Sequence, residues 1–223
     1  MIAEIHCHSK STKLSYFPWF YDSVMTVDQI IETCLAKNIL ILAITDHDSL
    51  GGYWKAKKII EDRKLNIILV PGMEISTKQG HVLGYGIEKE VGPNLSPEKT
   101  IDLIHKQGGI AIAAHPYLPF FSLNNKILEL KFDAFEGYNS AATKSANVKS
   151  VNSANKMALP ITAGSDAHSI SGLGTGVMIF DDAKIKNWKD VIKAMRRGEF
   201  KTKIEYQNKL KIVCDSIREN VKL

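Results

Sequence analysis

The sequence is poor in cysteine and has no long apolar run. Its 223 residues include only three cysteines, Cys7, Cys34 and Cys214. An odd and sparse set argues against a disulfide framework and is typical of a reducing compartment, so we predict a cytoplasmic protein. The longest apolar run, Ile39 to Ile44, is far too short to cross a membrane. The first residues carry Glu4 where a signal peptide would be basic, so we expect neither a signal peptide nor a membrane partner.

No charge of either sign dominates the chain. The 29 Lys and Arg residues outnumber the 24 Asp and Glu residues by five, which makes the protein mildly basic and favours anionic ligands such as phosphates. The densest basic region runs from Arg196 to Lys211; we favour a solvated helix and tail there over a nucleic-acid patch. Hydrophobic residues make up 44% of the chain and charged residues 24%, which is ordinary for a globular protein and argues against disorder.

Short apolar runs alternate with helical patterns along the chain. We expect strands over 2–7, 39–44, 67–70, 81–85, 109–114, 134–138, 161–163 and 177–180, and helices over 26–37, 52–63, 96–108, 143–157 and 188–197. Thr26 with Gln29, and Ser96 before Pro97, are typical helix starts. Strands separated by helices imply parallel pairing. We therefore predict a compact α/β barrel in one domain, with an open doubly wound sheet as the alternative.

Histidines mark the ends of these strands. Six of the seven fall at or just beyond the end of an expected strand, or at its start in the case of His81, and only His105 lies in a helical pattern. The loops that follow the strands build the active site of α/β barrels. Six imidazoles converging on one rim are hard to explain as packing, which makes metal binding the better interpretation.

Taken alone, each motif can be explained by an ordinary structural role without a metal. His6 and His8 are two apart on a strand and face the same way, so both can bind one ion while Cys7 points elsewhere. Asp46 and His47 could instead be a helix-capping cluster. Together, the motifs at successive strand ends indicate a multinuclear metal centre.

The motifs, in order, resemble the PHP family, the polymerase and histidinol phosphatase superfamily. They are His6-Cys-His8-Ser, Thr45-Asp-His47-Asp, Pro71-Gly-Met-Glu74 with His81, Ala114-His115-Pro, Phe135-Glu-Gly-Tyr-Asn139 and Gly164-Ser-Asp166-Ala-His168. The resemblance implies a distorted (β/α)7 barrel of the PHP type over about residues 1–180, which residues 181–223 complete or flank within one domain. It also implies two or three divalent metal ions that serve phosphoester hydrolysis.

The resemblance also implies a ligand set. His6, His8, Glu74 and Asp166 would hold a first ion, and Glu74, His81 and His115 a second, with Glu74 bridging. His47 and His168 would hold a third. The family's last ligand to the third ion would fall at Lys13 or Leu14, and neither can serve. Residues 10–20 look like an insertion, so we predict that Asp22 takes this place.

The sequence therefore predicts a metal-dependent phosphoesterase in which metal-activated hydroxide attacks phosphorus. Lys10 or Lys13 could contact the substrate, and Asp46 is a candidate catalytic residue that could orient a ligand or move a proton. The ligands suit zinc, manganese or iron.

A small phosphomonoester or nucleotide is the favoured substrate. Histidinol phosphate and single-stranded nucleic acid are the alternatives within the enzyme class. A non-catalytic metal-stabilised scaffold is the rival of a different class. The aromatic segment 16–21 could stack on a substrate or plug the barrel mouth.

Overall fold

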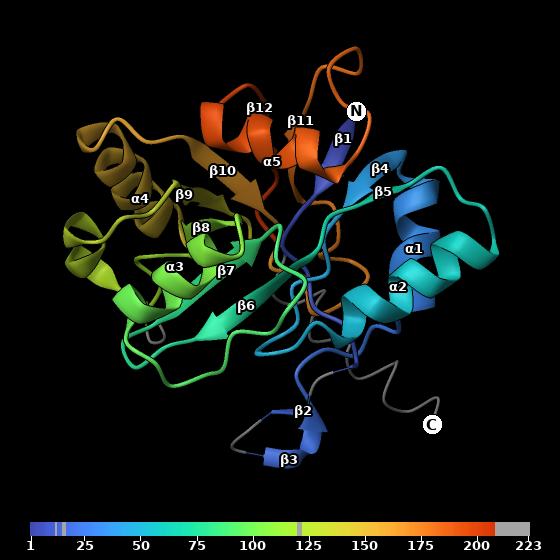
Figure 1. Ribbon diagram of the computed structural model, residues 1–223, viewed down its shortest axis with the longest axis horizontal. Coiled ribbons are helices and arrows are strands. Elements are labelled where there is room, and N and C mark those ends of the chain that lie inside the picture. Colours follow the sequence, from blue (N-terminus) through green and yellow to red (C-terminus); the bar gives the residue numbers. More distant parts are fainter. Residues whose placement is uncertain (12, 15–16, 120–121, 208–223) are drawn as a thin grey trace.

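The computed structural model describes residues 1–11, 13–14, 17–119 and 122–207. Strands in these ranges form two five-stranded sheets and one two-stranded sheet (Figure 1). The first sheet has the order β12 (Lys201–Ile204), β11 (Gly176–Ile179), β1 (Ile2–Glu4), β4 (Ile39–Leu42) and β5 (Ile68–Leu69). The second has the order β10 (Ile161–Gly164), β9 (Ala134–Asn139), β8 (Ile110–Ala113), β7 (His81–Tyr85) and β6 (Gly72–Ser76). The small sheet pairs β2 (Lys13–Leu14) with β3 (Phe17–Tyr21) and stands apart from the two larger sheets.

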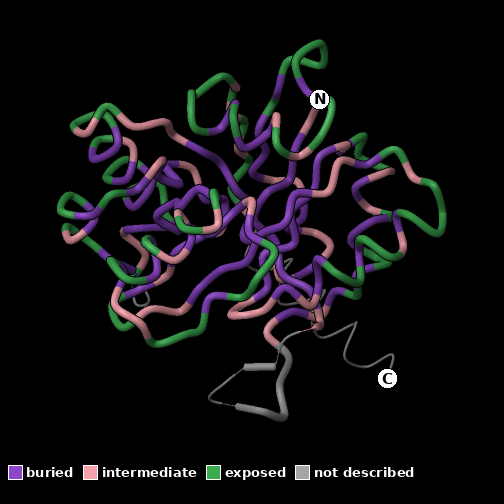
Figure 2. Tube along the Cα trace, viewed as in Figure 1, coloured by how far each residue is buried: buried purple, intermediate pink, exposed green. Residues whose placement is uncertain are grey.

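Helices cover the outer faces of the two larger sheets. They are α1 (Val27–Ala36), α2 (Gly51–Asp62), α3 (Pro97–Lys106), α4 (Lys144–Lys156), α5 (Trp188–Arg197) and the short 3-10 helix η1 (Asn124–Glu129). Helices α1 and α2 pack on each other and on β4 and β5, whereas α3 and α4 pack on β7, β8 and β9. Figure 2 shows the buried residues along the strands and the exposed residues on the outer sides of the helices. None of the helices in the described part of the chain is long and apolar enough to span a bilayer.

Local sequence signals set the helix ends as predicted. Thr26 and Gln29 form a capping box at the start of α1. Ser96 caps α3 and is followed by Pro97 at the first helical position. Thr143 caps α4, because its side chain accepts a hydrogen bond from the amide of Ala146. These side chains satisfy amide groups that the first helical turn leaves without partners.

The expectation of parallel pairing throughout is wrong. Strand β7 is antiparallel to β6 and β8, and β11 is antiparallel to β1 and β12. Only residues 77–80 connect β6 to β7, and a parallel connection needs a crossover of a dozen or more residues. The strand expected over 67–70 continues past Pro71 as β6, so Glu74 lies within a strand and not just beyond one. Strands β2, β3 and β12 were not expected.

Isolated bridges join the two large sheets at one edge. Cys7 pairs in parallel with Ala167, and His47 pairs in parallel with Glu74. Backbone hydrogen bonds accompany both, from His8 N to Ala167 O at 2.9 Å and from Asp48 N to Glu74 O at 2.8 Å. These bridges link the residues after β1 to those after β10, and the residues after β4 to β6; β5 and β6 follow each other along the chain but belong to different sheets.

The glycine pair at the start of α2 generates the first prediction. A Cβ atom on Gly52 would overlap Oδ2 of Asp46 and press on Ile44, whereas a Cβ on Gly51 would meet Ser49 Oγ at 3.2 Å. We expect Gly52→Ala to lower the free energy of unfolding by about 1–3 kcal/mol, because the buried carboxylate must move. Urea unfolding measures this change. Gly51→Ala is the matched control, and equal losses in both variants would contradict the prediction.

Candidate metal centre

The side chains predicted to bind metal lie together at the edge where the two sheets are bridged. His6 and His8 follow β1, His47 follows β4, Glu74 lies in β6, His81 begins β7, His115 follows β8, Asp166 and His168 follow β10, and Asp22 lies between β3 and α1. The ligand atoms of all of these residues except His115 form three overlapping groups, and the atoms of each group lie within 4.8 Å of one another. The first group is His6, His8, Glu74 and Asp166, the second is His47, Glu74 and His81, and the third is His8, Asp22, His47 and His168.

Glu74 stands at the centre of this arrangement. Its Oε2 atom lies 3.2 Å from Nε2 of both His6 and His8. Its Oε1 atom lies 2.9 Å from His81 Nδ1 and 2.9 Å from His115 Nε2. The two carboxylate oxygens therefore face different pairs of imidazoles, which is the arrangement needed to bridge two cations.

The first predicted group is brought together as a whole. Asp166 Oδ1 lies 3.5 Å from His6 Nε2 and 3.3 Å from His8 Nε2. His6, His8, Glu74 and Asp166 are all buried. Cys7 points away, as expected, because its Sγ atom lies against the carbonyl oxygen of Ala43.

The second group is more crowded than predicted. His81 Nδ1 and His115 Nε2 both lie 2.9 Å from the Oε1 atom of Glu74, so these two predicted ligands face the same oxygen. His47 also approaches, with its Nε2 atom 3.7 Å from Glu74 Oε2. His47 therefore lies between the second and third groups.

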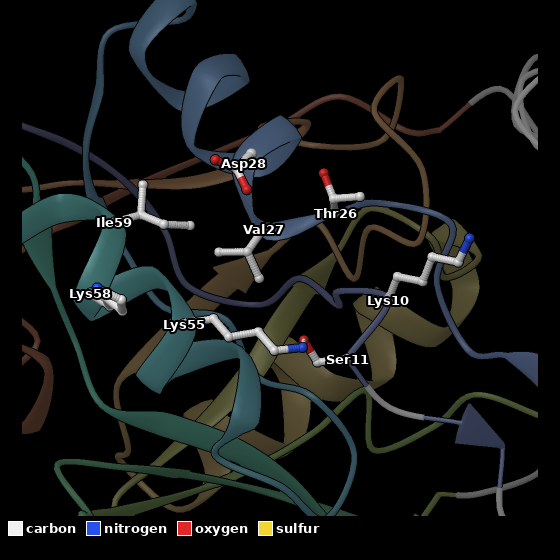
Figure 3. A pocket seen from close by; sticks show the side chains of 8 residues that line it. All are labelled: Lys10, Ser11, Thr26, Val27, Asp28, Lys55, Lys58 and Ile59. Atoms are coloured by element: carbon white, nitrogen blue, oxygen red, sulfur yellow. Dashed lines mark hydrogen bonds between the residues drawn. The ribbon is translucent and has the colours of Figure 1, made fainter. Parts of the chain in front are cut away.

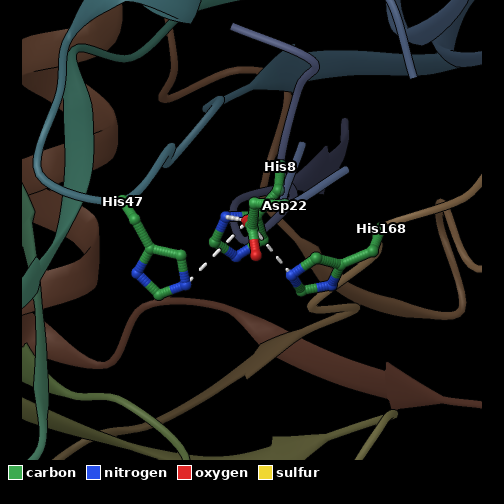
Figure 4. A group of neighbouring side chains, drawn as sticks. All are labelled: His8, Asp22, His47 and His168. Carbon is green, nitrogen blue, oxygen red and sulfur yellow. Dashed lines mark ion pairs between the residues drawn. The ribbon is translucent and has the colours of Figure 1, made fainter. Parts of the chain in front are cut away.

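Asp22 lies beside the other residues of the third group, although the spacing of the motifs along the sequence does not mark its position. Its Oδ2 atom lies 3.3 Å from His168 Nε2, 3.3 Å from His8 Nδ1 and 3.9 Å from His47 Nε2 (Figure 4). His168 Nδ1 lies 3.0 Å from the carbonyl oxygen of Asp166 and can donate to it, which leaves Nε2 available as a ligand. His8 faces the first group with Nε2 and Asp22 with Nδ1, so it connects the two groups.

Two of these residues have strained backbones. His115 has φ of 26° and Asp166 has φ of 51°, in a region of backbone conformation that residues other than glycine rarely occupy. Such conformations persist only where surrounding contacts hold them, and they cluster at functional sites. One residue separates each of them from the end of the preceding strand, so the chain turns sharply there and directs the side chain into the centre.

The buried polar atoms of the centre fit a divalent cation. Atoms buried without a hydrogen-bond partner include both ring nitrogens of His8, Oδ2 of Asp22, and Nδ1 of His47 and of His115. Buried polar groups are normally paired, so a cluster of exceptions calls for a ligand. Imidazole nitrogens and carboxylate oxygens are the donor set of zinc, manganese and iron sites.

The close packing of buried acids and imidazoles shifts the pKa values of residues in the centre. Burial alone would raise the pKa of Glu74, but the imidazoles of His47, His81 and His6 outweigh it and hold that pKa well below its usual range. Burial would lower the pKa of His8, yet Asp166 and Glu74 outweigh it and raise the pKa to about 10. For His47 burial prevails and lowers the pKa to about 4. The imidazoles thus favour the ionised form of Glu74, and cations that bind here must displace protons from imidazoles such as His8.

Glu136 is a site residue to which the sequence reasoning gave no role. Its Oε1 atom lies 2.7 Å from His6 Nδ1, and its Oε2 atom accepts hydrogen bonds from the His115 amide at 2.8 Å and the Asn139 side chain at 3.0 Å. Glu136 thus fixes the ring of His6 with Nε2 toward Glu74. One feature of the sequence pointed to Glu136, which is a single acid within a strand of buried residues. A buried charge must be paired, so such a residue is expected to have a partner.

The carboxylate of Asp46 lies where it can hold the backbone after His8 in place. Its Oδ1 atom accepts a hydrogen bond from the Ser9 amide at 2.6 Å, and its Oδ2 atom accepts one from the Ser9 hydroxyl at 2.7 Å. Both carboxylate oxygens are therefore engaged beside His8. These contacts suit the orienting role predicted for Asp46, and a role in proton transfer stays a prediction.

The predicted substrate contacts are only partly described. Lys10 follows the His8 loop and lines a cavity beside the start of α1. The side chain of Lys13 and those of the aromatic segment 16–21 lie outside the described part of the structure.

Comparison with known proteins places the chain in a family. Residues 144–200 match the family model described as PHP-associated. An uncharacterized protein of Methanocaldococcus jannaschii is 36% identical over 143 residues, which cover 62% of this chain and 82% of that protein. A second uncharacterized protein of the same organism is 27% identical over 230 residues, covering 97% of this chain and 82% of that protein.

Solved structures share the fold. PsfC from Pseudomonas syringae superimposes with a TM-score of 0.71 at 16% identity, covering 100% of this chain and 98% of PsfC. A two-domain protein from Bacteroides vulgatus, described as containing a predicted PHP-like metal-dependent phosphoesterase, gives a TM-score of 0.71 at 12% identity, covering 98% of this chain and 69% of that protein. The chain belongs to the PHP-domain family.

The contact between Glu136 and His6 generates the second prediction. Glu136→Gln keeps the shape of the side chain but removes the charge that orients the ring. We expect the affinity for Mn²⁺ or Zn²⁺ to fall about 10–100-fold, the usual effect of losing a partner behind a metal-binding histidine. Competition with a chelating dye measures the affinity. Glu129→Gln, at an exposed position of η1, is the control, and unchanged affinity in Glu136→Gln would contradict this role.

The place of Asp22 generates the third prediction. Asp22→Asn removes the charge that faces His8, His47 and His168, so we expect the bound metal per chain to fall by about one equivalent. Elemental analysis of the purified variant measures the metal content. Asp102→Asn, at an exposed position of α3, is the control. Full metal content in Asp22→Asn would show that the third group does not depend on this carboxylate.

Proposed function

We propose that the protein hydrolyses phosphate esters of small molecules or nucleotides with two or three divalent cations. The observation that carries this proposal is the convergence on Glu74, whose two oxygens face four imidazoles at 2.9–3.2 Å. Divalent cations lower the pKa of water and neutralise the charge that develops on phosphate oxygens. The buried, unpaired nitrogen and oxygen atoms of the centre support this interpretation.

The position of each predicted ligand determines which ion it would hold. Glu74, with His6, His8 and Asp166, would hold one ion, and Glu74 with His81 and His115 would hold another. Asp22, His47 and His168 would hold a third. Glu136 would hold the ring of His6 in its orientation, and Asp46 would hold the loop at His8 through a hydrogen bond to Ser9.

The fold proposal accompanies this function. The pairing of β1 with β4 and of β4 with β5, the pairing of β6 through β10, and the two bridges between the sheets support a distorted seven-stranded barrel, if β5 and β6 are counted as one interrupted strand. Residues 181–204 pack on the same core through Val191 and Met195, which supports one domain over residues 1–223. A cytoplasmic location stays a prediction from cysteine usage.

Nucleic-acid cleavage is the second candidate. A stretch of 90 residues is 29% identical to a 5'-3' exoribonuclease of Haemophilus influenzae, covering 39% of this chain and 29% of that enzyme. The lesion-specific endonuclease EndoQ of Pyrococcus furiosus gives a TM-score of 0.62 at 20% identity, covering 91% of this chain and 58% of EndoQ. Histidinol phosphate and the non-catalytic scaffold stay as the remaining alternatives.

Phosphate release tests the proposal and gives the fourth prediction. The protein loaded with Mn²⁺, Zn²⁺ or Fe²⁺ should release phosphate from p-nitrophenyl phosphate or from a panel of phosphorylated metabolites. His115→Ala should lower turnover at least about 100-fold, because it removes a contact to Glu74, while circular dichroism stays native. His105→Ala is the matched control, because His105 pairs with Asp133 away from the centre.

Two outcomes would contradict the proposal in different ways. No turnover with any metal or phosphoester would favour the scaffold. Turnover that survives in His115→Ala would place the reaction elsewhere.

A further inference from the structure

Most of the predicted metal ligands lie in loops that follow strands. Loops are more mobile than the strands they connect, so a ligand in a loop needs contacts that hold it in place. The loop after β1 has such a contact with α2, because Lys55 donates to Ser11 Oγ at 3.1 Å (Figure 3). The loop after β10, which carries Asp166 and His168, is contacted by residues 205–207, which follow β12.

Backbone hydrogen bonds direct residues 205–207 from β12 toward the ends of β9 and β10. Glu205 N donates to the carbonyl oxygen of Thr175 at 2.6 Å, and Gln207 N donates to that of Ser140 at 3.0 Å. Thr175 directly precedes β11, and Ser140 directly follows β9. The chain therefore leaves the edge strand of its sheet and reaches the edge where the predicted ligands lie.

The side-chain amide of Gln207 uses both of its N–H donors. Its Nε2 atom donates to the carbonyl oxygen of Ser165 at 2.5 Å and to Ser140 Oγ at 3.1 Å. Ser140 Oγ in turn donates to the same carbonyl oxygen at 2.9 Å. Gly172 leaves room for the amide, because a Cβ atom there would lie 3.1 Å from Nε2 of Gln207. Two side chains thus hold the carbonyl group of Ser165.

This carbonyl belongs to the peptide group that joins Ser165 to Asp166. The amide of the same group, Asp166 N, donates to the carbonyl oxygen of His6 at 2.7 Å. Because the peptide group is planar, bonds at both of its polar ends fix its orientation. Asp166 has φ of 51°, a conformation that persists only where its surroundings hold it. The contacts of Gln207 therefore help to direct the Asp166 carboxylate at His6 and His8.

We propose that Gln207 is a positioning residue for the metal centre. Its side-chain amide holds the peptide group between Ser165 and Asp166, and thereby keeps Asp166 directed at the first group. Gln207 lies beyond residues 144–200, which match the PHP-associated family model, so that match does not include this contact. The proposal rests on the metal binding within the proposed function and does not require hydrolysis.

The fifth prediction compares two glutamines. Gln207→Met keeps the length of the side chain, adds no charge and removes the donors to Ser165. We expect the affinity for Mn²⁺ to fall about fivefold, the usual effect of losing a neutral hydrogen bond, because Asp166 is held less firmly. Competition with a chelating dye measures the affinity. Gln107→Met is the matched control, because Gln107 Nε2 also donates to a backbone carbonyl, that of Lys89 at 2.9 Å, but at the end of α3.

A spectroscopic measurement separates positioning from a general loss of stability. The visible absorption spectrum of protein saturated with Co²⁺ reports the ligands and the geometry around the ion. The spectrum should change in Gln207→Met and stay unchanged in Gln107→Met, whereas a loss of stability alone would alter neither spectrum. Circular dichroism should stay native in both variants.

The outcomes distinguish this proposal from the proposed function. Unchanged Mn²⁺ affinity in Gln207→Met, or an equal loss of affinity in Gln107→Met, overturns the positioning role. Changes in affinity and spectrum that are confined to Gln207→Met, in a protein that hydrolyses no phosphoester, would support the positioning role and overturn the proposed hydrolysis.

Discussion

The carboxylate of Glu74 is the interaction on which the centre depends. It is 1% exposed and contacts His6 and His8 with one oxygen and His81 and His115 with the other. An ionised carboxylate at such depth is costly unless opposite charge surrounds it. The imidazoles supply that charge when protonated, and divalent cations would supply it in their place. The site is therefore built to hold positive charge.

A second layer of buried acids holds the metal-facing side chains in place. Glu136 fixes the His6 ring, and Asp46 fixes Ser9 beside His8. Glu4 accepts hydrogen bonds from the amides of His6 at 3.1 Å and Gly174 at 2.8 Å. Each acid contacts at least one residue from a different segment of the chain. Positions separated by more than a hundred residues are thereby held in one geometry.

Much of this arrangement could be predicted from the sequence, and the reasons for the remainder are physical. Helix starts such as Thr26 and Ser96 are encoded by side chains that bond the adjacent backbone, so they can be recognised locally. Strand direction is not encoded locally, because an apolar run looks the same in parallel and antiparallel pairing; β7 and β11 were therefore expected in the wrong sense. The role of Glu136 depends on His6, which lies 130 residues away, and no local pattern carries that contact.

The bridges Cys7–Ala167 and His47–Glu74 have a mechanical consequence. They close the pairing between the two large sheets at the same edge that gathers the imidazoles and carboxylates. His8 follows a strand of one sheet and Glu74 belongs to the other, so a cation shared by these two side chains would fasten the sheets together. Binding of such a cation would stabilise the fold, and its loss would loosen the edge at which the two sheets are bridged.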